Sequence, residues 1–441
     1  MRFLALIART VVGSLFVVSG LIKANDSLGF SYKLEKYFAE NVFDLPFLMD
    51  YALPLAFIIA LVEVVVGFGT LLGSRSERFR RLRPTDPILL LMVLFFTWLT
   101  FYSAYYGVVK DCGCFGEALK LTPWESFSKN VVLLILVVII LADRRKISPY
   151  EERKDLIILP FSLLLIGLFS VGVLGWWFPV VFSLLVFAVA VLIRKVLEKK
   201  AITEWTLLAV YLLFTSLFSF FTLHYLPIKD FRPYAKGKSI PDQMSVPPDE
   251  QPVYQSTFIY QHKKSGKKKS IPQDSLGAYD LDEWKYVERS TRLVKEGRTP
   301  PIEDFNFENQ AGTKDVTHKL IGDTAKDNRT GYVFLVVAYD LYHTDTSAYD
   351  KLNTLRKKAE KNGHSFYGAT GSSGDKPFEF RQKHQIMYPF FSADKILLKT
   401  IIRSNPGLVL IKDGNVLAKW PSTDLPRFEE VKKKHIEGKA V

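Results

Sequence analysis

Two apolar runs enclose a short loop that holds both cysteines of the chain: PILLLMVLFFTWLTFYSAYYGVV (Pro87–Val109), DCGCFG (Asp111–Gly116) and FSKNVVLLILVVIILA (Phe127–Ala142). A helix that crosses a bilayer needs about 17 to 25 mostly apolar residues. The first run has this length and the second is slightly shorter. The sequence therefore predicts two membrane spans joined by a loop in which Cys112 and Cys114 are one residue apart.

Apolar segments of this kind are concentrated before about residue 227. The 441 residues are 48% hydrophobic and 14% aromatic, yet 23% are charged. Such a mixture indicates a membrane half and a soluble half in one chain. Seven segments are predicted to span the membrane: Phe3–Leu21, Tyr51–Leu72, Pro87–Val109, Phe127–Ala142, Leu156–Leu174, Trp176–Ile193 and Trp205–Tyr225.

Lysine and arginine accumulate in every second loop of the membrane half. Residues 74–86, 143–155 and 194–204 contain five, five and four of them, whereas the alternate loops contain three and two. Because basic loops stay in the cytoplasm, we expect a protein of the bacterial inner membrane with its amino terminus on the cytoplasmic side. Cys112, Cys114 and everything after the seventh span then lie in the periplasm, where disulfides form. Basic cytoplasmic loops account for the net charge of +13, so no nucleic-acid partner is expected.

The spacing of the two cysteines favours reversible chemistry. A disulfide between them closes only through a tight ring, for which Gly113 supplies the backbone freedom. So small a loop stabilises a fold by about 1.6 kcal/mol in the chain-entropy estimate, roughly half the value for a 15-residue loop. Redox use therefore explains the pair better than a structural role, with a passive disulfide or two idle thiols as the alternatives.

Charged residues flank the cysteine pair. Asp111 and Glu117 would raise the thiol pKa values, and Lys110 and Lys120 would oppose this effect. No metal site is expected, because two thiolates supply half of a tetrahedral shell and the loop contains no histidine.

Two ionisable residues, Arg9 and Glu63, lie inside predicted spans. Charges in the membrane are costly, so they face the bundle interior and often pair. The simpler interpretation is an ion pair between Arg9 and Glu63 that holds two helices together. The alternative is that one of them tunes the thiols, or relays protons for them or for a membrane electron carrier.

A set of residues in the first 145 positions forms a recognisable pattern: Arg9-Thr10-Val11-Val12-Gly13, Phe16, Ser19-Gly20, Lys23, Glu63, Gly67 and Cys112-Gly113-Cys114-Phe115-Gly116. This pattern resembles the DoxX-like superfamily, and within it the MauE branch of methylamine utilisation membrane proteins. It implies a four-helix bundle in a redox-associated inner-membrane protein, linked in the MauE case to maturation of a disulfide-rich periplasmic partner. This chain adds three spans and a large soluble domain, so the substrate does not carry over.

The soluble half begins with a proline-rich tether, residues 227–297, which includes a small β element around the turn Lys263–Lys267. Residues 298–441 then alternate between strands and helices. The predicted elements are the strand 331–339, the helix 347–362, the strand 365–369, the helix 375–383, the strand 408–411, the turn 412–415 and the strand 416–420.

This order resembles the thioredoxin-like fold and its peroxiredoxin-like relatives, with Pro406 at the position of their cis proline. Where those relatives carry a catalytic cysteine, the chain reads Leu341-Tyr342-His343-Thr344-Asp345-Thr346. The domain therefore cannot perform thiol exchange, and the resemblance implies a docking surface shaped by Pro406. His343, isolated in a polar loop, is expected to be solvated.

Together these features predict a polytopic α-helical membrane protein with a C-terminal α/β domain. The expected parts are a DoxX/MauE-like four-helix domain (1–145), additional transmembrane helices (155–226), the periplasmic tether (227–297) and a cysteine-free thioredoxin-like domain (298–441). The leading hypothesis is a thiol-disulfide redox protein that uses Cys112 and Cys114 on a periplasmic protein partner. A non-enzymatic envelope scaffold and a conduit centred on Arg9 and Glu63 are the alternatives. The sequence does not determine the electron carrier, which could be a quinone or another membrane carrier.

Overall fold

The computed structural model describes residues 2–73, 85–109, 113, 115–142, 152–197, 201–278, 281–295, 297–322 and 331–438. These residues form two compact units. The first unit contains Met1–Arg232 together with two segments from the far end of the chain, Lys399–Gly407 and Trp420–Pro426. The second unit contains Pro233–Leu398, Leu408–Lys419 and Arg427–Val441. The predicted boundaries near residues 145, 227 and 298 stay predictions.

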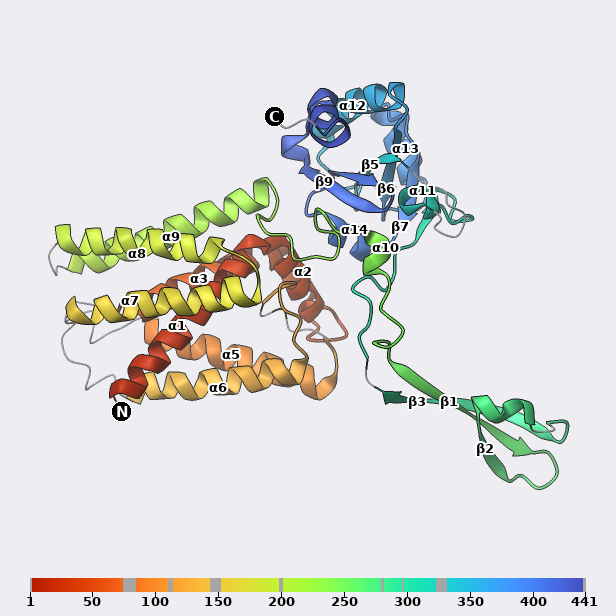
Figure 1. Ribbon diagram of the computed structural model, residues 1–441, viewed down its shortest axis with the longest axis horizontal. Coiled ribbons are helices and arrows are strands. Elements are labelled where there is room, and N and C mark those ends of the chain that lie inside the picture. Colours follow the sequence, from red (N-terminus) through yellow and green to blue (C-terminus); the bar gives the residue numbers. More distant parts are fainter. Residues whose placement is uncertain are drawn as a thin grey trace. The chain divides into compact units, whose positions relative to one another are not determined.

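The first unit is a bundle of long helices (Figure 1). Its elements are α1 (Arg2–Asn25), α2 (Ser27–Phe38), η1 (Pro46–Tyr51), α3 (Ala52–Leu72), α5 (Thr85–Tyr106), α6 (Pro123–Ala142), α7 (Glu152–Gly167), η2 (Leu168–Val173), α8 (Phe178–Val196) and α9 (Ala201–His224). Among the described residues, six helices are long and apolar enough to cross a membrane: Phe3–Asn25, Pro46–Leu72, Thr85–Tyr106, Pro123–Ala142, Phe178–Val196 and Ile202–His224. The chain is therefore a membrane protein.

The fifth predicted span differs from the others. Helix α7 runs into the π-helix η2, and the described apolar part, Ile158–Val173, is shorter than the six spans. Helix α7 nevertheless packs against α1 and α8. The total of seven spans thus stays a prediction.

Close packing of α1 against α3 forms the centre of this bundle, and it depends on glycine. A Cβ atom on Gly13 would lie 2.6 Å from Leu71 Cγ, and a Cβ atom on Gly67 would lie 2.8 Å from the backbone nitrogen of Val17. Small residues at such crossings let two backbones approach closely, as is common where lipid surrounds the helices. Gly13 and Gly67 therefore fix how α1 and α3 are aligned.

Helix directions alternate along the bundle (Figure 1), so α1 ends at the same side where α5 ends and α6 begins. The cysteine loop follows α5 there. Helix α2, which the sequence analysis did not anticipate, lies at this side too, and Asp26 caps its start by accepting a hydrogen bond from Gly29 N at 2.8 Å. The described helix ends that border the lysine- and arginine-rich segments, such as the end of α3 and the start of α5, lie at the opposite side.

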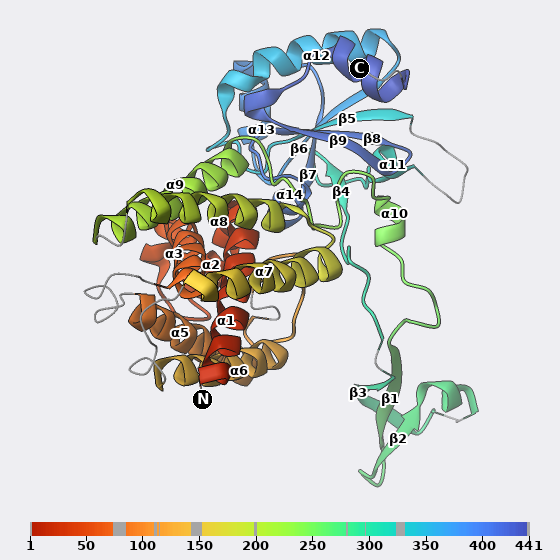
Figure 2. The ribbon, with the colours of Figure 1, turned by 60° about the vertical axis from the view of Figure 1, so that its left-hand side comes forward.

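A six-stranded sheet of order β4-β7-β6-β5-β8-β9 organises the C-terminal part of the chain (Figure 2). Strands β5, β6 and β7 pair in parallel, and β4 pairs with β7 antiparallel. The strands are β4 (Phe307–Asn309), β5 (Tyr332–Val337), β6 (Ser365–Thr370), β7 (Phe390–Ala393), β8 (Gly407–Lys412) and β9 (Asn415–Pro421), with helices α12 (Tyr349–Lys361), α13 (Lys376–Lys383) and α14 (Lys395–Ile401) between them. Strand β5 is buried on both faces, as its unbroken apolar run requires.

The predicted strands and helices of this part are confirmed, and the turn between β8 and β9 has the expected chemistry. Asp413 and Gly414 both have positive φ angles, 48° and 79°, which the tightest hairpin turns require. Strands β4 and β7 and helix α14 were not predicted, because they are short and lack a clear apolar pattern.

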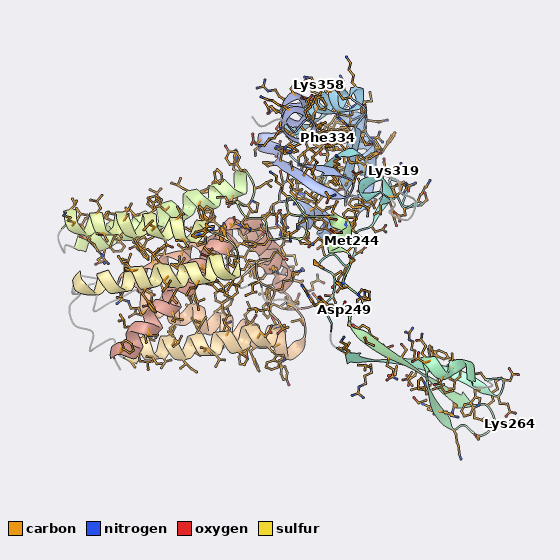
Figure 3. All side chains as sticks on the ribbon, viewed as in Figure 1. Met244, Asp249, Lys264, Lys319, Phe334 and Lys358 are labelled. Carbon is orange, nitrogen blue, oxygen red and sulfur yellow. The ribbon has the colours of Figure 1, made fainter. Side chains whose placement is uncertain are left out.

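A separate three-stranded antiparallel sheet lies in the tether region (Figure 3). Its order is β2-β1-β3, with β1 (Val253–His262), β2 (Lys268–Pro272) and β3 (Trp284–Lys295). The hairpin of β1 and β2 around the lysine-rich turn was expected. Strand β3 was missed, because its residues are almost all exposed and mostly polar.

Candidate functional site

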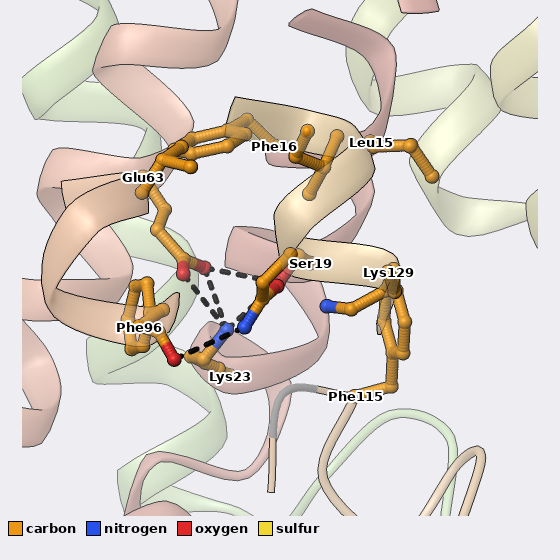
Figure 4. Close-up of a pocket in the computed structure, with 11 residues that line it drawn as sticks. Leu15, Phe16, Ser19, Lys23, Glu63, Phe96, Phe115 and Lys129 are labelled. Atoms are coloured by element: carbon orange, nitrogen blue, oxygen red, sulfur yellow. Dashed lines mark hydrogen bonds and ion pairs between the residues drawn. The ribbon is translucent and has the colours of Figure 1, made fainter. Parts of the chain in front are cut away.

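Lys23 of α1 and Glu63 of α3 form a buried ion pair (Figure 4). Lys23 Nζ lies 2.9 Å from Glu63 Oε1 and 2.8 Å from Oε2, and only 1% and 4% of the two side chains are exposed. Ser19, one turn before Lys23, accepts a hydrogen bond from Lys23 Nζ (2.7 Å) and donates one to Glu63 Oε2 (3.2 Å). The three side chains satisfy one another where an unpaired charge would be costly.

Aromatic rings complete the surroundings of the lysine. The Nζ atom of Lys23 lies 5.5 Å from the centre of the Phe30 ring and 5.6 Å from that of Phe96. Ring faces carry negative potential and attract a cation at this distance. The pair is therefore held by packing from α2 and α5 as well as by its own charges.

A small cavity of about 30 Å³ lies beside the ion pair. Lys129 and Phe115 face it from the side opposite Lys23 and Glu63 (Figure 4). This volume has room for one or two water molecules and for no larger ligand. With two lysines and one carboxylate, the cavity wall carries an excess of one formal positive charge.

Phe115 connects the cavity to the cysteine loop, because it follows Cys114 directly in the chain. Its side chain is 5% exposed and its ring centre lies 4.8 Å from Lys129 Nζ. On the other side of Cys114, Gly113 has a φ angle of 67°, and a Cβ atom there would lie 2.8 Å from Lys33 Cδ. Close packing thus fixes both neighbours of Cys114.

The cysteines themselves, Cys112 and Cys114, lie outside the described residues, as does Asp111. Of the predicted site residues, the structure places Gly113, Arg9, Glu63 and Pro406. Gly113 packs against Lys33 of α2, and Glu63 lies in the interior of the bundle, beside the cavity to which Phe115 contributes.

The predicted ion pair between Arg9 and Glu63 is wrong. Arg9 donates hydrogen bonds to the backbone oxygens of Thr70 and Leu71 instead, with a distance of 3.0 Å to Leu71 O. These carbonyls are at the carboxyl end of α3, where a helix leaves its last oxygens without partners. Arg9 therefore caps α3, and the partner of Glu63 is Lys23. The sequence held a signal for this, since Ser19 and Lys23 are four residues apart and share one helix face.

A second layer of charged residues joins α2 to the segment Lys399–Gly407 within the first unit. Arg403 Nε lies 2.9 and 3.1 Å from the two carboxylate oxygens of Asp26. Lys399 Nζ lies 3.3 Å from Glu35 Oε2 and 3.8 Å from the centre of the Tyr32 ring. A segment from the far end of the chain is thus attached to α2.

Burial opposes ionisation of Asp26, but the charges of Arg403 and Arg232 and the hydrogen bonds to the carboxylate outweigh it. The pKa of Asp26 therefore lies below its ordinary value. Arg232 is only 2% exposed. Its Nε atom lies 2.7 Å from Asp230 Oδ1, and its Nη1 atom donates a hydrogen bond to Thr400 O at 3.1 Å. Asp26 is consequently ionised at neutral pH and paired with Arg403.

A second cavity, of about 20 Å³, lies between the two layers. Lys23 lines both cavities, and Asp26, Lys33 and Glu117 also line the outer one. Lys33 Nζ lies 3.3 Å from Glu117 Oε1. A series of ionisable groups therefore leads from Glu63 to the region of the cysteine loop.

The remaining predictions concern the C-terminal part. Pro406 follows a cis peptide bond and is buried, so it does not line an open groove in this state. The side chain of His343 is 83% exposed, as expected for a solvated histidine, and Nδ1 lies 3.3 Å from Asp340 Oδ2. Among the described residues, no three His, Cys, Asp or Glu side chains are grouped so that they could hold a metal ion.

Comparisons with known proteins found similarity to other proteins for the amino-terminal membrane part of the chain. Residues 1–143 match the family model described as methylamine utilisation protein MauE. Protein TlpB of Flavobacterium psychrophilum is 31% identical over 137 residues, which cover 30% of this chain and 34% of TlpB. The match thus spans about a third of that relative. No solved structure matches the chain. Residues 1–143 are thus similar to MauE-type membrane proteins.

Proposed function

We propose that this protein is a membrane thiol-disulfide redox protein in which Cys112 and Cys114 exchange with a partner in the cell envelope. The observation that carries the proposal is the position of Phe115. This residue follows Cys114 directly and also lines the cavity beside the buried Lys23 and Glu63. A pair of thiols is thus joined to an ionisable centre inside the membrane domain. The MauE match of residues 1–143 supports the same class of protein.

The exchange moves two electrons and two protons. A thiolate of the partner attacks the disulfide of Cys112 and Cys114, a mixed disulfide forms, and one of the two cysteines leaves as a thiolate. The second thiol of the partner then attacks the mixed disulfide. The partner leaves with a new disulfide, and Cys112 and Cys114 become a dithiol; the reverse sequence reduces the partner.

The distribution of charge supports an orientation with the cysteine loop in the periplasm. The three basic loops connect helix ends at one side of the bundle, and the cysteine loop joins α5 to α6 at the other. We place the basic side in the cytoplasm of a bacterial cell. Cys112 and Cys114 then lie where disulfides persist.

The C-terminal part would be a thioredoxin-like module that positions the partner. The strand order and the place of Pro406 directly before β8 support this fold. Because Pro406 is buried, the partner would contact other surfaces of the module.

Thiol trapping in intact cells tests the proposal. A mass-adding alkylating reagent would be applied to the wild type and to Cys112→Ser and Cys114→Ser variants of the full chain. We expect both a reduced and an oxidised form of the cysteine pair, and the ratio between them should change when respiration is blocked. One of the single-cysteine variants should form a mixed disulfide with a partner.

A pair locked in one state under all conditions, with no captured partner, would favour an envelope scaffold instead. One observation favours that second candidate: the ion pair of Arg403 with Asp26 would serve a scaffold equally well. The double variant with both cysteines replaced by serine separates the two, because a scaffold would keep its function.

A further inference from the structure

The three-stranded sheet of β1, β2 and β3 has almost no hydrophobic core of its own (Figure 3). Of the residues in its three strands, only Ser256 and Ile271 are buried. Six apolar or aromatic side chains of β1 and β3 are at least 38% exposed: Val253, Tyr254, Tyr286, Val287, Leu293 and Val294. A sheet this small is marginally stable in water, so a further surface that covers these side chains would stabilise it.

One face of this sheet combines aromatic and cationic side chains. The strand pairing places Phe258 opposite Arg289, and Tyr260 opposite Tyr286. Arg289 Cζ lies 5.7 Å from the centre of the Phe258 ring, and the ring centres of Tyr260 and Tyr286 are 5.9 Å apart. Tyr254 shares this face, because alternate residues of a strand point to the same side. Tyrosine and tryptophan rings of this kind are enriched where a protein meets lipid headgroups.

Positive charge is concentrated at one end of the sheet, where Figure 3 labels Lys264. Glu283 Oε1 lies 3.2 Å from Lys264 Nζ, and the Trp284 ring centre lies 6.0 Å from Lys269 Nζ. Within the described part of the chain, Lys267 and Lys268 make no ion pair. The hairpin Val253–Pro272 contains no Asp or Glu. It has five lysines within seven residues, all of them exposed: Lys263, Lys264, Lys267, Lys268 and Lys269.

The charge and the exposed rings together indicate the kind of surface that fits the sheet. An acidic protein would pair with the lysines. A bilayer surface offers anionic phosphates and apolar chains side by side, and therefore matches both the lysines and the exposed Tyr254, Tyr286 and Leu293. The chain is already anchored in a bilayer by its membrane helices, so lipid is also the partner at the highest effective concentration.

We propose that the three-stranded sheet binds the surface of a bilayer that contains anionic lipid. Lys267 and Lys268 contact the phosphate groups, and Tyr254, Tyr286 and Leu293 enter the boundary between headgroups and acyl chains. The tether region is then a second, peripheral membrane anchor. This role needs neither cysteine and does not depend on the redox function proposed above.

Flotation of the full chain with vesicles tests the charge requirement. The protein, held in nanodiscs of phosphatidylcholine, should float with vesicles that contain phosphatidylglycerol and not with vesicles of phosphatidylcholine alone. Lys267→Gln/Lys268→Gln should weaken this binding by about 30-fold, since each lysine near an anionic surface contributes about fivefold. Lys267→Arg/Lys268→Arg should retain it. Lys433→Gln/Lys434→Gln, with the same charge change at exposed positions of η7 (Lys432–Ile436), is the matched control and should also retain it.

A fluorescent probe tests whether the sheet enters the lipid interface of its own membrane. Leu293→Cys, 43% exposed, would be labelled with an environment-sensitive dye in the Cys112→Ser/Cys114→Ser background. The emission should shift to shorter wavelength when nanodiscs of phosphatidylcholine are replaced by nanodiscs that also contain phosphatidylglycerol. Lys267→Gln/Lys268→Gln should remove this shift.

Three results would overturn the lipid site. The first is an emission that is identical in both kinds of nanodisc. The second is equal loss of vesicle binding in the η7 control, which would show a non-specific effect of net charge. The third is binding to polyglutamate without binding to vesicles, which would assign the lysines to an acidic protein partner instead.

Discussion

Arg403 and Asp26 are bound to each other across 377 residues of the chain, with Arg403 Nε at 2.9 and 3.1 Å from the two carboxylate oxygens. Asp26 at the same time caps the start of α2 through Gly29 N. Arg403 is 9% exposed, and its neighbour Lys399 pairs with Glu35 on the same helix. One carboxylate thus orders α2 and retains a segment from the C-terminal part of the chain.

Asp26→Asn should make the protein less stable at neutral pH and should reduce its sensitivity to acid. The pKa of Asp26 is lowered in the folded protein, so its charge contributes stability above the unfolded pKa, about 4, and this contribution disappears as pH falls through the lower folded pKa. We expect a loss of roughly 1.5 to 3 kcal/mol at pH 7, as for a hydrogen bond to a charged group.

Thermal unfolding of the solubilised full chain at pH 7 and at pH 3 measures this effect. The difference between wild type and Asp26→Asn should shrink at the lower pH. Asp50→Asn, at an exposed position, is the control and should match the wild type at both. An equal difference at both pH values would contradict the role assigned to Arg403 and Asp26.

Lys23→Met should be strongly destabilising, because it leaves the buried carboxyl group of Glu63 without its cation. Breaking a buried ion pair in this way costs about 3 to 5 kcal/mol. The double variant Lys23→Met/Glu63→Leu removes both charges and should recover most of that loss. Thermal unfolding followed by circular dichroism compares the three proteins.

The same variants distinguish a purely structural role of Lys23 and Glu63 from a role in proton transfer. If Lys23 and Glu63 serve only to hold α1 to α3, the double variant should exchange disulfides at the wild-type rate. A stable double variant whose exchange is at least tenfold slower would instead assign the pair a part in proton transfer. Equal instability of single and double variants would show that the two charges are not coupled.

Gly67→Ala should disrupt the contact between α1 and α3. The added methyl group would lie 2.8 Å from Val17 N, a backbone atom that cannot move without its helix. Overpacking of this kind costs about 1 to 3 kcal/mol. Gly172→Ala is the control, since a Cβ atom there meets no atom within 4 Å, and it should be neutral or slightly stabilising. The check is the fraction of folded monomer in detergent; equal yields would contradict the packing role.

Much of the architecture could be predicted because its pattern is local. The membrane helices follow from apolar length, and β5, β6, β8 and β9 follow from short apolar runs between turn residues. Helix α2 and strand β3 were missed because neither has an apolar run: α2 carries Lys33, Glu35 and Lys36 among its twelve residues, and β3 is exposed along almost its whole length.

The partner of Glu63 could not be predicted in the same way, because it depends on how two helices are aligned. Gly13 lies against Leu71 and Gly20 against Val64, so α1 and α3 run antiparallel with Arg9 close to Gly73. Arg9 and Lys23 are fourteen residues apart, about 21 Å along a helix, and only one can reach Glu63. That alignment is set by the glycine contacts, which involve both helices.

Gly113→Ala should slow thiol exchange and destabilise the cysteine loop. Gly113 has a φ angle of 67°, which costs an alanine roughly 1 kcal/mol, and its Cβ atom would also lie 2.8 Å from Lys33 Cδ. Gly107→Ala is a matched control, because Gly107 has a φ angle of 65° and open space around it, so it shares the backbone cost alone. Alkylation kinetics of the reduced full chain compares the two. Slower or altered reactivity in Gly113→Ala only would link the loop conformation to the thiols, whereas identical rates would show that close packing beside Lys33 has no influence on them.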